Sequence, residues 1–189
     1  MALAQSLYTV QQNEDFSLLD PNRPDALGAA LSAALPVAVL IIFNGLASAA
    51  GWTAAVPQYN GVSFVPPTWL ASAITIAILP MWGLARWMVW QRGEQGRAAS
   101  WWVLALITWS LALPFLTSGF DLLGMTFANV ISLLLAVGTG AKVFAVSKRA
   151  FLLVLPSVCW MGFTTFLGFA AIAQGWSPGF AATQQGAQG

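Results

Sequence analysis

Five long apolar runs dominate this chain and decide what it can fold into. An α-helix needs roughly 20 mostly apolar residues to cross the hydrocarbon core of a bilayer, and the runs are close to or above that length. They are continuous rather than alternating, which excludes the strands of a membrane β-barrel. The sequence therefore predicts an all-α integral membrane protein, a bundle of five transmembrane helices at residues 27–52, 68–91, 100–117, 121–146 and 151–175.

The composition agrees with a surface that lies in lipid. Hydrophobic residues make up 58% of the 189 positions and charged residues only 7%, whereas a soluble domain carries about a quarter charged residues. The chain divides into an acidic, polar N-terminal extension (residues 1–26), the transmembrane domain (27–176) and a tail (177–189) that we expect to be flexible. The polar start differs from a signal peptide, which has a basic segment followed by an apolar one.

Several classes of function are excluded by what the sequence lacks. The net charge is +1, so the chain has no basic field to attract nucleic acid. Histidine is absent, which removes imidazole metal ligands and serine–histidine catalysis. No run places two carboxylates, or a nucleophile and a base, on one helix face. We therefore expect neither an enzyme nor a metal site.

The charges between the runs predict the orientation in the membrane. The second and fourth connections hold Arg92, Glu94, Arg97, Lys148 and Arg149, whereas the third connection holds no Lys or Arg. With five spans, the second and fourth connections share a side with the N-terminus. Because Lys and Arg concentrate on the cytoplasmic side, we expect a cytoplasmic N-terminus, in a bacterial inner or intracytoplasmic membrane.

Most of the ten tryptophans fall into two groups. Trp82, Trp109 and Trp160 lie well inside predicted spans, where an indole N–H needs a hydrogen-bond partner or a cavity. They either pack inside the bundle or line a pocket for a flat aromatic ligand. A second group lies near the ends of the spans, as is typical of the aromatic belts at headgroup depth: Trp52, Trp69, Trp90, Trp101, Trp102 and Trp176.

A few polar residues and prolines within or beside the runs carry structural expectations. Asn44 and Asn129 are expected to form hydrogen bonds between helices. Asp121 precedes the fourth run and suits a helix N-terminus. Because membrane helices tolerate proline when neighbours satisfy the freed carbonyl, we expect kinks rather than breaks at Pro36, Pro80, Pro114 and Pro156.

Two short motifs point to a known family. Residues 63–69, Ser-Phe-Val-Pro-Pro-Thr-Trp, close the long first loop and resemble the pattern S-[FW]-x-P-P-x-W. Residues 156–167, Pro-Ser-Val-Cys-Trp-Met-Gly-Phe-Thr-Thr-Phe-Leu, resemble P-Y-L-x-W-x-x-F-A-T-Y-L-N in the fifth span. With the five spans and the abundant tryptophan, the chain resembles the TspO/MBR family of tryptophan-rich sensory proteins over roughly residues 30–175. The N-terminal extension is not part of the resemblance.

The resemblance implies a five-helix bundle, often a homodimer, with a ligand pocket that opens under the first loop. Members of the family are associated with porphyrins and other tetrapyrroles, and with the regulation of pigment synthesis or stress responses. Trp160 would be the pocket tryptophan of the fifth span, and Pro66 and Pro67 would form the hinge of a lid. The candidate ligand-binding residues are Trp160, Phe64, Trp69, Trp82, Trp109 and Phe163.

The chain also departs from the family pattern, and the departures leave two functions open. Thr75 and Leu79 replace an aromatic pair of the second span, and Ser157, Phe166 and Gly168 replace Tyr, Tyr and Asn in the fifth. The first interpretation is a receptor for a tetrapyrrole or a similar flat hydrophobic molecule. The alternative is an accessory or scaffold subunit of a larger membrane complex, such as a photosynthetic pigment–protein assembly.

Each of the two interpretations predicts its own bound molecules and partners. No tightly held cofactor is implied, and a porphyrin, another tetrapyrrole or a carotenoid-type pigment is the candidate bound molecule. The lipid bilayer is the first expected partner, and a homodimer or a larger complex is the second. A small transporter is a weaker interpretation, because such folds usually show inverted repeats and polar sites at the membrane midplane.

Overall fold

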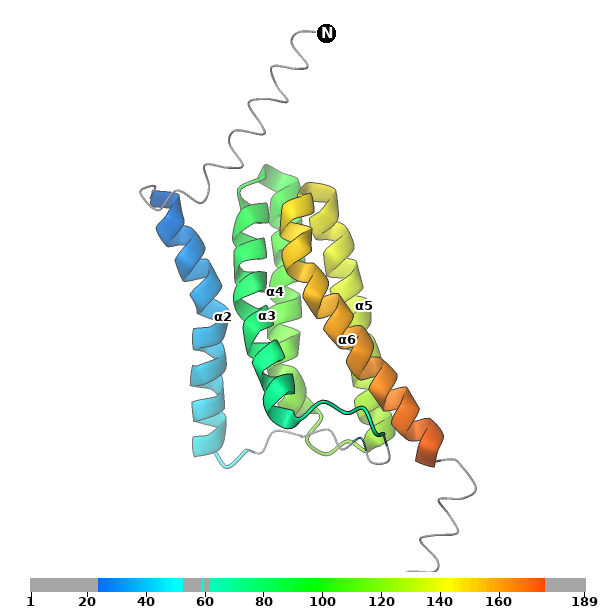
Figure 1. Ribbon diagram of the computed structural model, residues 1–189. Coiled ribbons are helices and arrows are strands. Elements are labelled where there is room, and N and C mark those ends of the chain that lie inside the picture. The colour runs from blue at the N-terminus through cyan, green and yellow to red at the C-terminus, as the bar shows by residue number, and fades with distance from the viewer. Residues whose placement is uncertain (1–23, 53–58, 60–61, 176–189) are drawn as a thin grey trace, which may run out of the picture.

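The described part of the chain is a bundle of long helices. The computed structural model describes residues 24–52, 59 and 62–175. This part contains five helices that are long and apolar enough to cross a membrane, which confirms the predicted all-α membrane bundle (Figure 1). The helices are α2 (Pro24–Ala49), α3 (Thr68–Trp90), α4 (Gly93–Leu116), α5 (Leu122–Val146) and α6 (Lys148–Gly175).

Three helices begin earlier than the predicted spans. Helix α2 begins at Pro24 rather than at residue 27, α4 at Gly93 rather than at residue 100, and α6 at Lys148 rather than at residue 151. Glu94 and Arg97 therefore belong to the first turns of α4 and not to the connection. A guanidinium nitrogen of Arg97 lies 3.4 Å from a carboxylate oxygen of Glu94. The helix starts differ from the predicted span starts because the first turns are polar. The apolar run reports only the part of a helix suited to hydrocarbon, and the helix extends beyond it.

Local sequence signals explain how the helices begin and continue. The side chain of Asp121 accepts a hydrogen bond of 2.8 Å from the backbone N–H of Gly124, so it caps α5 as expected. Gly93 has a φ of 75°, a left-handed conformation that glycine adopts without a steric penalty, and this allows the tight turn between α3 and α4. The helices continue through all four internal prolines, Pro36, Pro80, Pro114 and Pro156.

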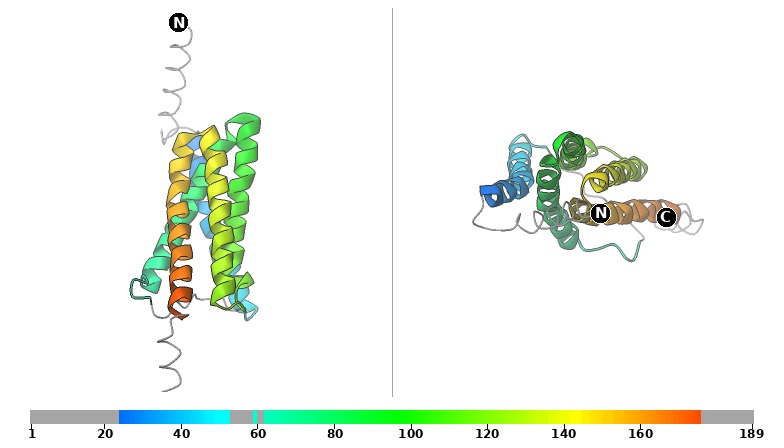
Figure 2. Two further views of the ribbon diagram at one scale, coloured as in Figure 1. Left: turned by 90° about the vertical axis from the view of Figure 1, so that its right-hand side faces the viewer. Right: turned by 90° about the horizontal axis from the view of Figure 1, so that it is seen from above.

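Helices α3 to α6 form the core, and α2 lies beside them (Figure 2). Helix α2 packs mainly along α3, where a Cβ added to Gly83 would come within 2.0 Å of the carbonyl oxygen of Ser32. Phe43 of α2 also meets Phe115 of α4 edge to face, with ring centroids 4.9 Å apart. The buried core lies between α3, α4, α5 and α6 and includes Leu79, Trp82, Val103, Leu106, Ala136, Val143 and Val154.

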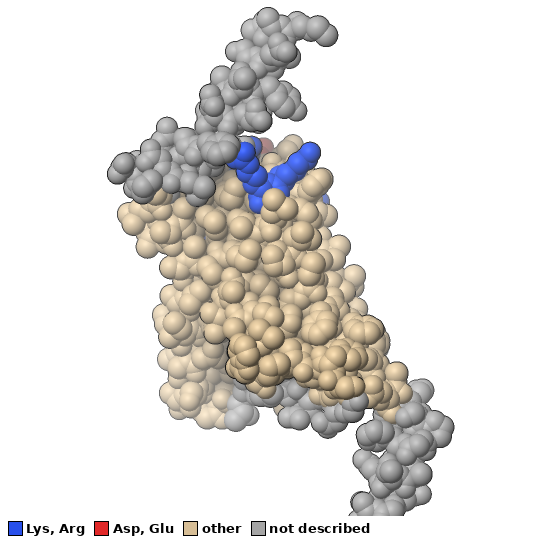
Figure 3. Space-filling model, in the orientation of Figure 1, with Lys and Arg blue, Asp and Glu red and all other residues tan. Residues whose placement is uncertain are grey.

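The two ends of the bundle differ in charge. The start of α2 and the α3–α4 and α5–α6 turns lie at one end, and the first loop and the α4–α5 turn lie at the other (Figure 1). The exposed Lys and Arg visible in Figure 3 gather at the first of these ends. We call it the basic end and define it by Arg92, Arg97, Lys148 and Arg149. The side of the membrane that it faces stays a prediction.

Candidate ligand site under the first loop

The described residues of the first loop, 59 and 62–67, contact α5 and α6 at the end of the bundle opposite the basic end. Val62 is only 8% exposed and forms a cluster with Leu167 and Ala171 of α6. Tyr59 of the loop and Phe163 of α6 are partly buried against the same cluster. An apolar loop residue buried in this way removes its side chain from water and holds the loop on the bundle.

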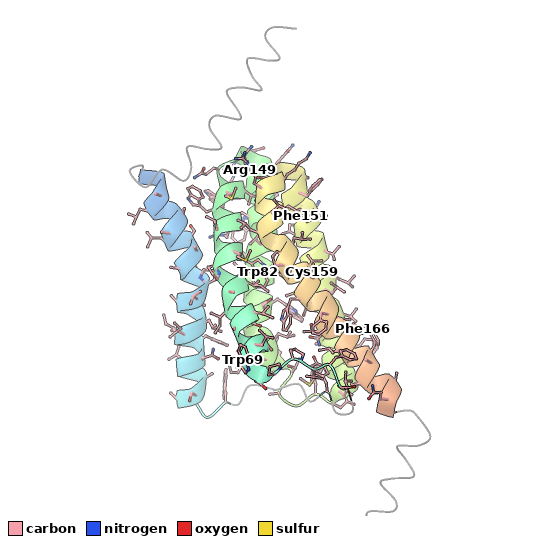
Figure 4. The ribbon with its side chains drawn as sticks, viewed as in Figure 1. Trp69, Trp82, Arg149, Phe151, Cys159 and Phe166 are labelled. Carbon is pink, nitrogen blue, oxygen red and sulfur yellow. The ribbon has the colours of Figure 1, made fainter. Side chains whose placement is uncertain are left out.

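A pair of aromatic rings fixes the loop to the outer surface of α6. The rings of Phe64 and Phe166 are stacked, with centroids 5.9 Å apart and planes 23° apart. Figure 4 shows Phe166 on α6 where the first loop crosses the helix. Both side chains remain at least half exposed, at 50% and 58%. The stack therefore holds the loop in place from outside and does not itself line a closed pocket.

The end of the loop is stiff where it joins α3. Pro67 is the N-cap residue of α3 and has extended backbone angles, with φ −61° and ψ 147°. Proline fixes φ near this value and also restricts the residue before it, so Pro66 and Pro67 restrict how the loop enters the helix. This geometry suits the predicted hinge.

Trp160 and Phe163 form an aromatic pair below the loop. Their ring centroids are 5.7 Å apart, with planes tilted by 32°. Trp160 packs against the main core, and Phe163 packs against the cluster of Val62, Leu167 and Ala171. The pair therefore connects the bundle interior with the part of α6 that the first loop covers.

A polar contact also joins the loop to α5. The side-chain amide of Asn129 donates a hydrogen bond of 3.5 Å to the hydroxyl of Tyr59. Burial raises the pKa of Tyr59, and the hydrogen bond from Asn129 opposes this shift. Asn129 was expected to join two helices, but in the structure it joins a helix to the first loop. Asn44, the other asparagine that was expected to join two helices, is exposed on α2.

The family model described as TspO/MBR family matches residues 32–173. The chain belongs to the TspO/MBR family. Comparison with curated proteins returned no significant match, and comparison with solved structures returned none either. Both sequence motifs and all the residues of the loop and the aromatic pair lie inside the matched range.

Membership of the TspO/MBR family makes this chain a membrane protein of a binding or sensory kind. The family is generally receptor-like or transporter-like rather than enzymatic. The match begins at residue 32, within α2, so the whole N-terminal extension and the first turns of α2 lie outside it.

The structure separates the six candidate ligand residues of this TspO/MBR protein. Phe64, Trp160 and Phe163 lie at or below the first loop. Trp82 is 3% exposed in the core against which Trp160 also packs, and its indole N–H has no hydrogen-bond partner among the described residues. Trp69 is 71% exposed on the first turn of α3 (Figure 4).

Trp109 belongs to a different surface. Its indole N–H donates a hydrogen bond of 2.8 Å to Ser132 of α5, and Ser132 in turn donates to the carbonyl of Ala128. Its ring helps to line an open groove of about 500 Å³ on the outside of α4, with Leu135 of α5 at the edge. The deep indole thus has the partner that its depth requires. The other lining residues are Trp101, Leu104, Ala105, Thr108 and Ala112.

The sequence motifs did not reveal every residue of the site. Tyr59 and Val62 hold the loop against α5 and α6 and lie outside both motifs. Leu167 ends the second motif but had no role assigned, and Phe166 had been noted only as a departure from the family pattern. The available signal was the position of Tyr59 and Val62 just before the Ser-Phe-Val-Pro-Pro motif. The contact partners on α5 and α6 follow from the packing of distant helices and have no local signal.

Proposed function

We propose that this TspO/MBR protein is a membrane receptor that binds a tetrapyrrole, such as a porphyrin, under the first loop, and that binding is linked to pigment or stress regulation. The observation that carries the proposal is the Trp160–Phe163 pair, which lies next to the cluster covered by the loop. A tetrapyrrole is a flat π system that stacks on indole and phenyl rings.

The contacts of the loop support a lid that opens and closes. The described residues of the loop contact the bundle through a small apolar cluster around Val62, an exposed ring stack and a long hydrogen bond. Each of these contacts is modest on its own, so none of them alone would prevent the loop from opening. Movement of Val62 would uncover Phe163 and give a ligand access to the aromatic pair.

A binding titration tests the receptor. We expect Trp160→Phe to weaken porphyrin binding roughly 2- to 10-fold, the effect of losing part of an aromatic stack. Trp101→Phe is the matched control, because Trp101 is 64% exposed and lies on α4 far from the first loop. Porphyrin affinity that is the same in the wild type and in Trp160→Phe would contradict the proposal.

A second candidate function is favoured by the position of α2. This helix packs mainly along α3, and most of its large apolar side chains are exposed, among them Leu31, Leu35, Ile41 and Ile42. Such a helix suits an accessory subunit that contacts a neighbouring membrane protein, for example in a pigment–protein assembly.

Purification from native membranes in a gentle detergent distinguishes between the two proposed functions. A particle of one or two copies of this chain alone supports the receptor, and a large pigmented particle with other subunits supports the accessory subunit.

A further inference from the structure

The basic end of the bundle has an excess of exposed positive charge. Arg97 and Lys148 are exposed there, and Arg92 and Arg149 lie beside them in the chain or in the same turns. Of the acidic residues that the structure describes, those of this end are Glu94 and Asp25, which belongs to the first turn of α2, whereas Asp121 caps α5 at the other end. Glu94 pairs with Arg97 at 3.4 Å, but both are well exposed, at 91% and 56%, and exposed pairs are weak. The end therefore remains a positively charged surface.

The N-terminal extension is joined to the bundle at this same end. Helix α2 begins at Pro24, beside the α3–α4 and α5–α6 turns (Figure 1). The preceding 23 residues contain Glu14, Asp15 and Asp20 against the single basic residue Arg23. Residues 14–20 read Glu-Asp-Phe-Ser-Leu-Leu-Asp, so acidic residues flank an apolar centre. We call residues 14–20 the acidic segment.

The chain between the acidic segment and α2 is long enough for the segment to reach the basic end. An extended chain covers about 3.3 Å per residue, so the ten residues from Glu14 to Pro24 reach roughly 33 Å. Helix α6, which carries Lys148 and Arg149, packs on α3, and α3 packs on α2. Two helix spacings amount to about 20 Å, which lies within this reach.

We propose that the acidic segment docks on the basic end of its own bundle. Its carboxylates pair with Arg97 and Lys148, and its apolar centre packs against Trp90, the last residue of α3, which is 47% exposed. The guanidinium of Arg86 lies 5.7 Å from the ring centroid of Trp90, so this indole belongs to the same positive surface. Because the segment is tethered, its effective concentration is high, and individually weak charge pairs are enough to hold it.

The docked segment would cover the α3–α4 and α5–α6 turns. Anionic lipid headgroups carry the same charge as the segment and would compete with it for the basic end. Exposed charge pairs are also screened by salt, so docking should be strongest in zwitterionic lipid at low ionic strength. These two dependences distinguish charge-driven docking from simple apolar contact.

Distance measurements between two spin labels test the proposal in the full-length protein. Cys159→Ser removes the single cysteine, and Ser17→Cys and Gln95→Cys then place one label in the acidic segment and one on the exposed first turn of α4. In phosphatidylcholine nanodiscs at low salt, we expect a narrow population at short distance. It should become broad and long at high salt and in the Arg97→Glu, Lys148→Glu variant.

A charge swap and two controls make the result decisive. Adding Glu14→Lys and Asp15→Lys to the reversed variant should restore the short distance, because the attraction is then rebuilt with opposite signs. Ser118→Glu adds a negative charge at an exposed position of the opposite end and should leave the distance between the two labels unchanged. If the distribution of distances between the two labels is unchanged at high salt and in the charge-reversed variant, the proposal is overturned. A short distance that disappears when labelled protein is diluted with unlabelled protein also overturns it, because the contact is then between copies.

Discussion

At the scale of single residues, Tyr59 fixes a loop to a membrane bundle through both of its parts. The ring packs with the apolar cluster of the first loop, and the hydroxyl accepts a hydrogen bond from Asn129. Burial raises the pKa of Tyr59 above its ordinary value of 10.0, because the charged tyrosinate loses hydration in this position. The ionisation of one side chain is therefore coupled to the seating of the loop.

This coupling predicts how the loop responds to pH. The pKa is raised in the folded state, so the contribution of Tyr59 is fully present below pH 10.0, its ordinary pKa, and is lost as the pH rises through the raised value. Tyr8→Phe leaves Tyr59 as the only tyrosine, and its tyrosinate absorption can then be titrated. We expect a midpoint above the ordinary value, and a higher midpoint still in Asn129→Leu, which removes the opposing hydrogen bond. A midpoint at the ordinary value would contradict the burial of Tyr59.

The hydrogen bond between Trp109 and Ser132 leads to a second prediction at this scale. Ser132 is 2% exposed, and its hydroxyl is the partner of an indole N–H that faces an otherwise apolar region. We expect Ser132→Ala to lower the free energy of unfolding by about 1 kcal/mol, as is typical of hydrogen bonds between membrane helices. Unfolding in mixed detergent micelles measures this value, and Ser118→Ala in the exposed α4–α5 turn is the control. If Trp109→Phe and Ser132→Ala showed no coupling in a double-mutant cycle, the bond would contribute nothing.

These contacts also show what the sequence could not predict. Trp109 was expected to need a partner because of its depth, but nothing in the sequence near it names Ser132, which lies on the next helix. Asn129 was recognised as a polar residue inside a span, yet its partner is in a loop without any periodic pattern. Partners of this kind depend on how helices and loops meet in space, and a single sequence does not contain that information locally.

At the scale of elements, the five helices were predictable because each contains one continuous apolar run. The two motifs of the first loop and α6 also led to the correct family. The start of α4 was not predictable from apolar runs, because it depends on the turn at Gly93 and on the close contact of Gly96. A Cβ at Gly96 would lie 1.9 Å from the carbonyl oxygen of Val89. Helix ends outside the hydrocarbon are set by such contacts rather than by hydropathy.

The contact between α2 and α3 gives a prediction with a matched control. A Cβ at Gly83 would lie 2.0 Å from the backbone oxygen of Ser32, so Gly83→Ala must push the two helices apart. We expect a loss of about 1–3 kcal/mol, the usual cost of overpacking. Gly45→Ala is the control, because a Cβ there meets nothing within 4 Å, and it should be neutral or stabilising through helix propensity. Equal unfolding free energies for the two variants would contradict the close backbone contact.

At the scale of the whole molecule, two regions of different chemistry lie at opposite ends. The first loop and the Trp160–Phe163 pair belong to one end, and the positive surface and the start of α2 belong to the other. Ligand entry under the loop and docking of the acidic segment would thus occur on opposite sides of the membrane. A protein that senses a molecule on one side and contacts partners on the other needs this separation.

The orientation of the bundle is therefore the property on which this arrangement depends. Lys and Arg concentrate on the cytoplasmic side of membrane proteins, and the basic end holds Arg92, Arg97, Lys148 and Arg149. We expect this end to face the cytoplasm. On the Cys159→Ser background, a cysteine at Ser118 should react in intact cells with a maleimide that cannot cross the membrane. A cysteine at Gln95 should react only after the cells are opened. The reverse pattern would place the first loop on the cytoplasmic side, and a ligand would then reach Trp160 and Phe163 from inside the cell.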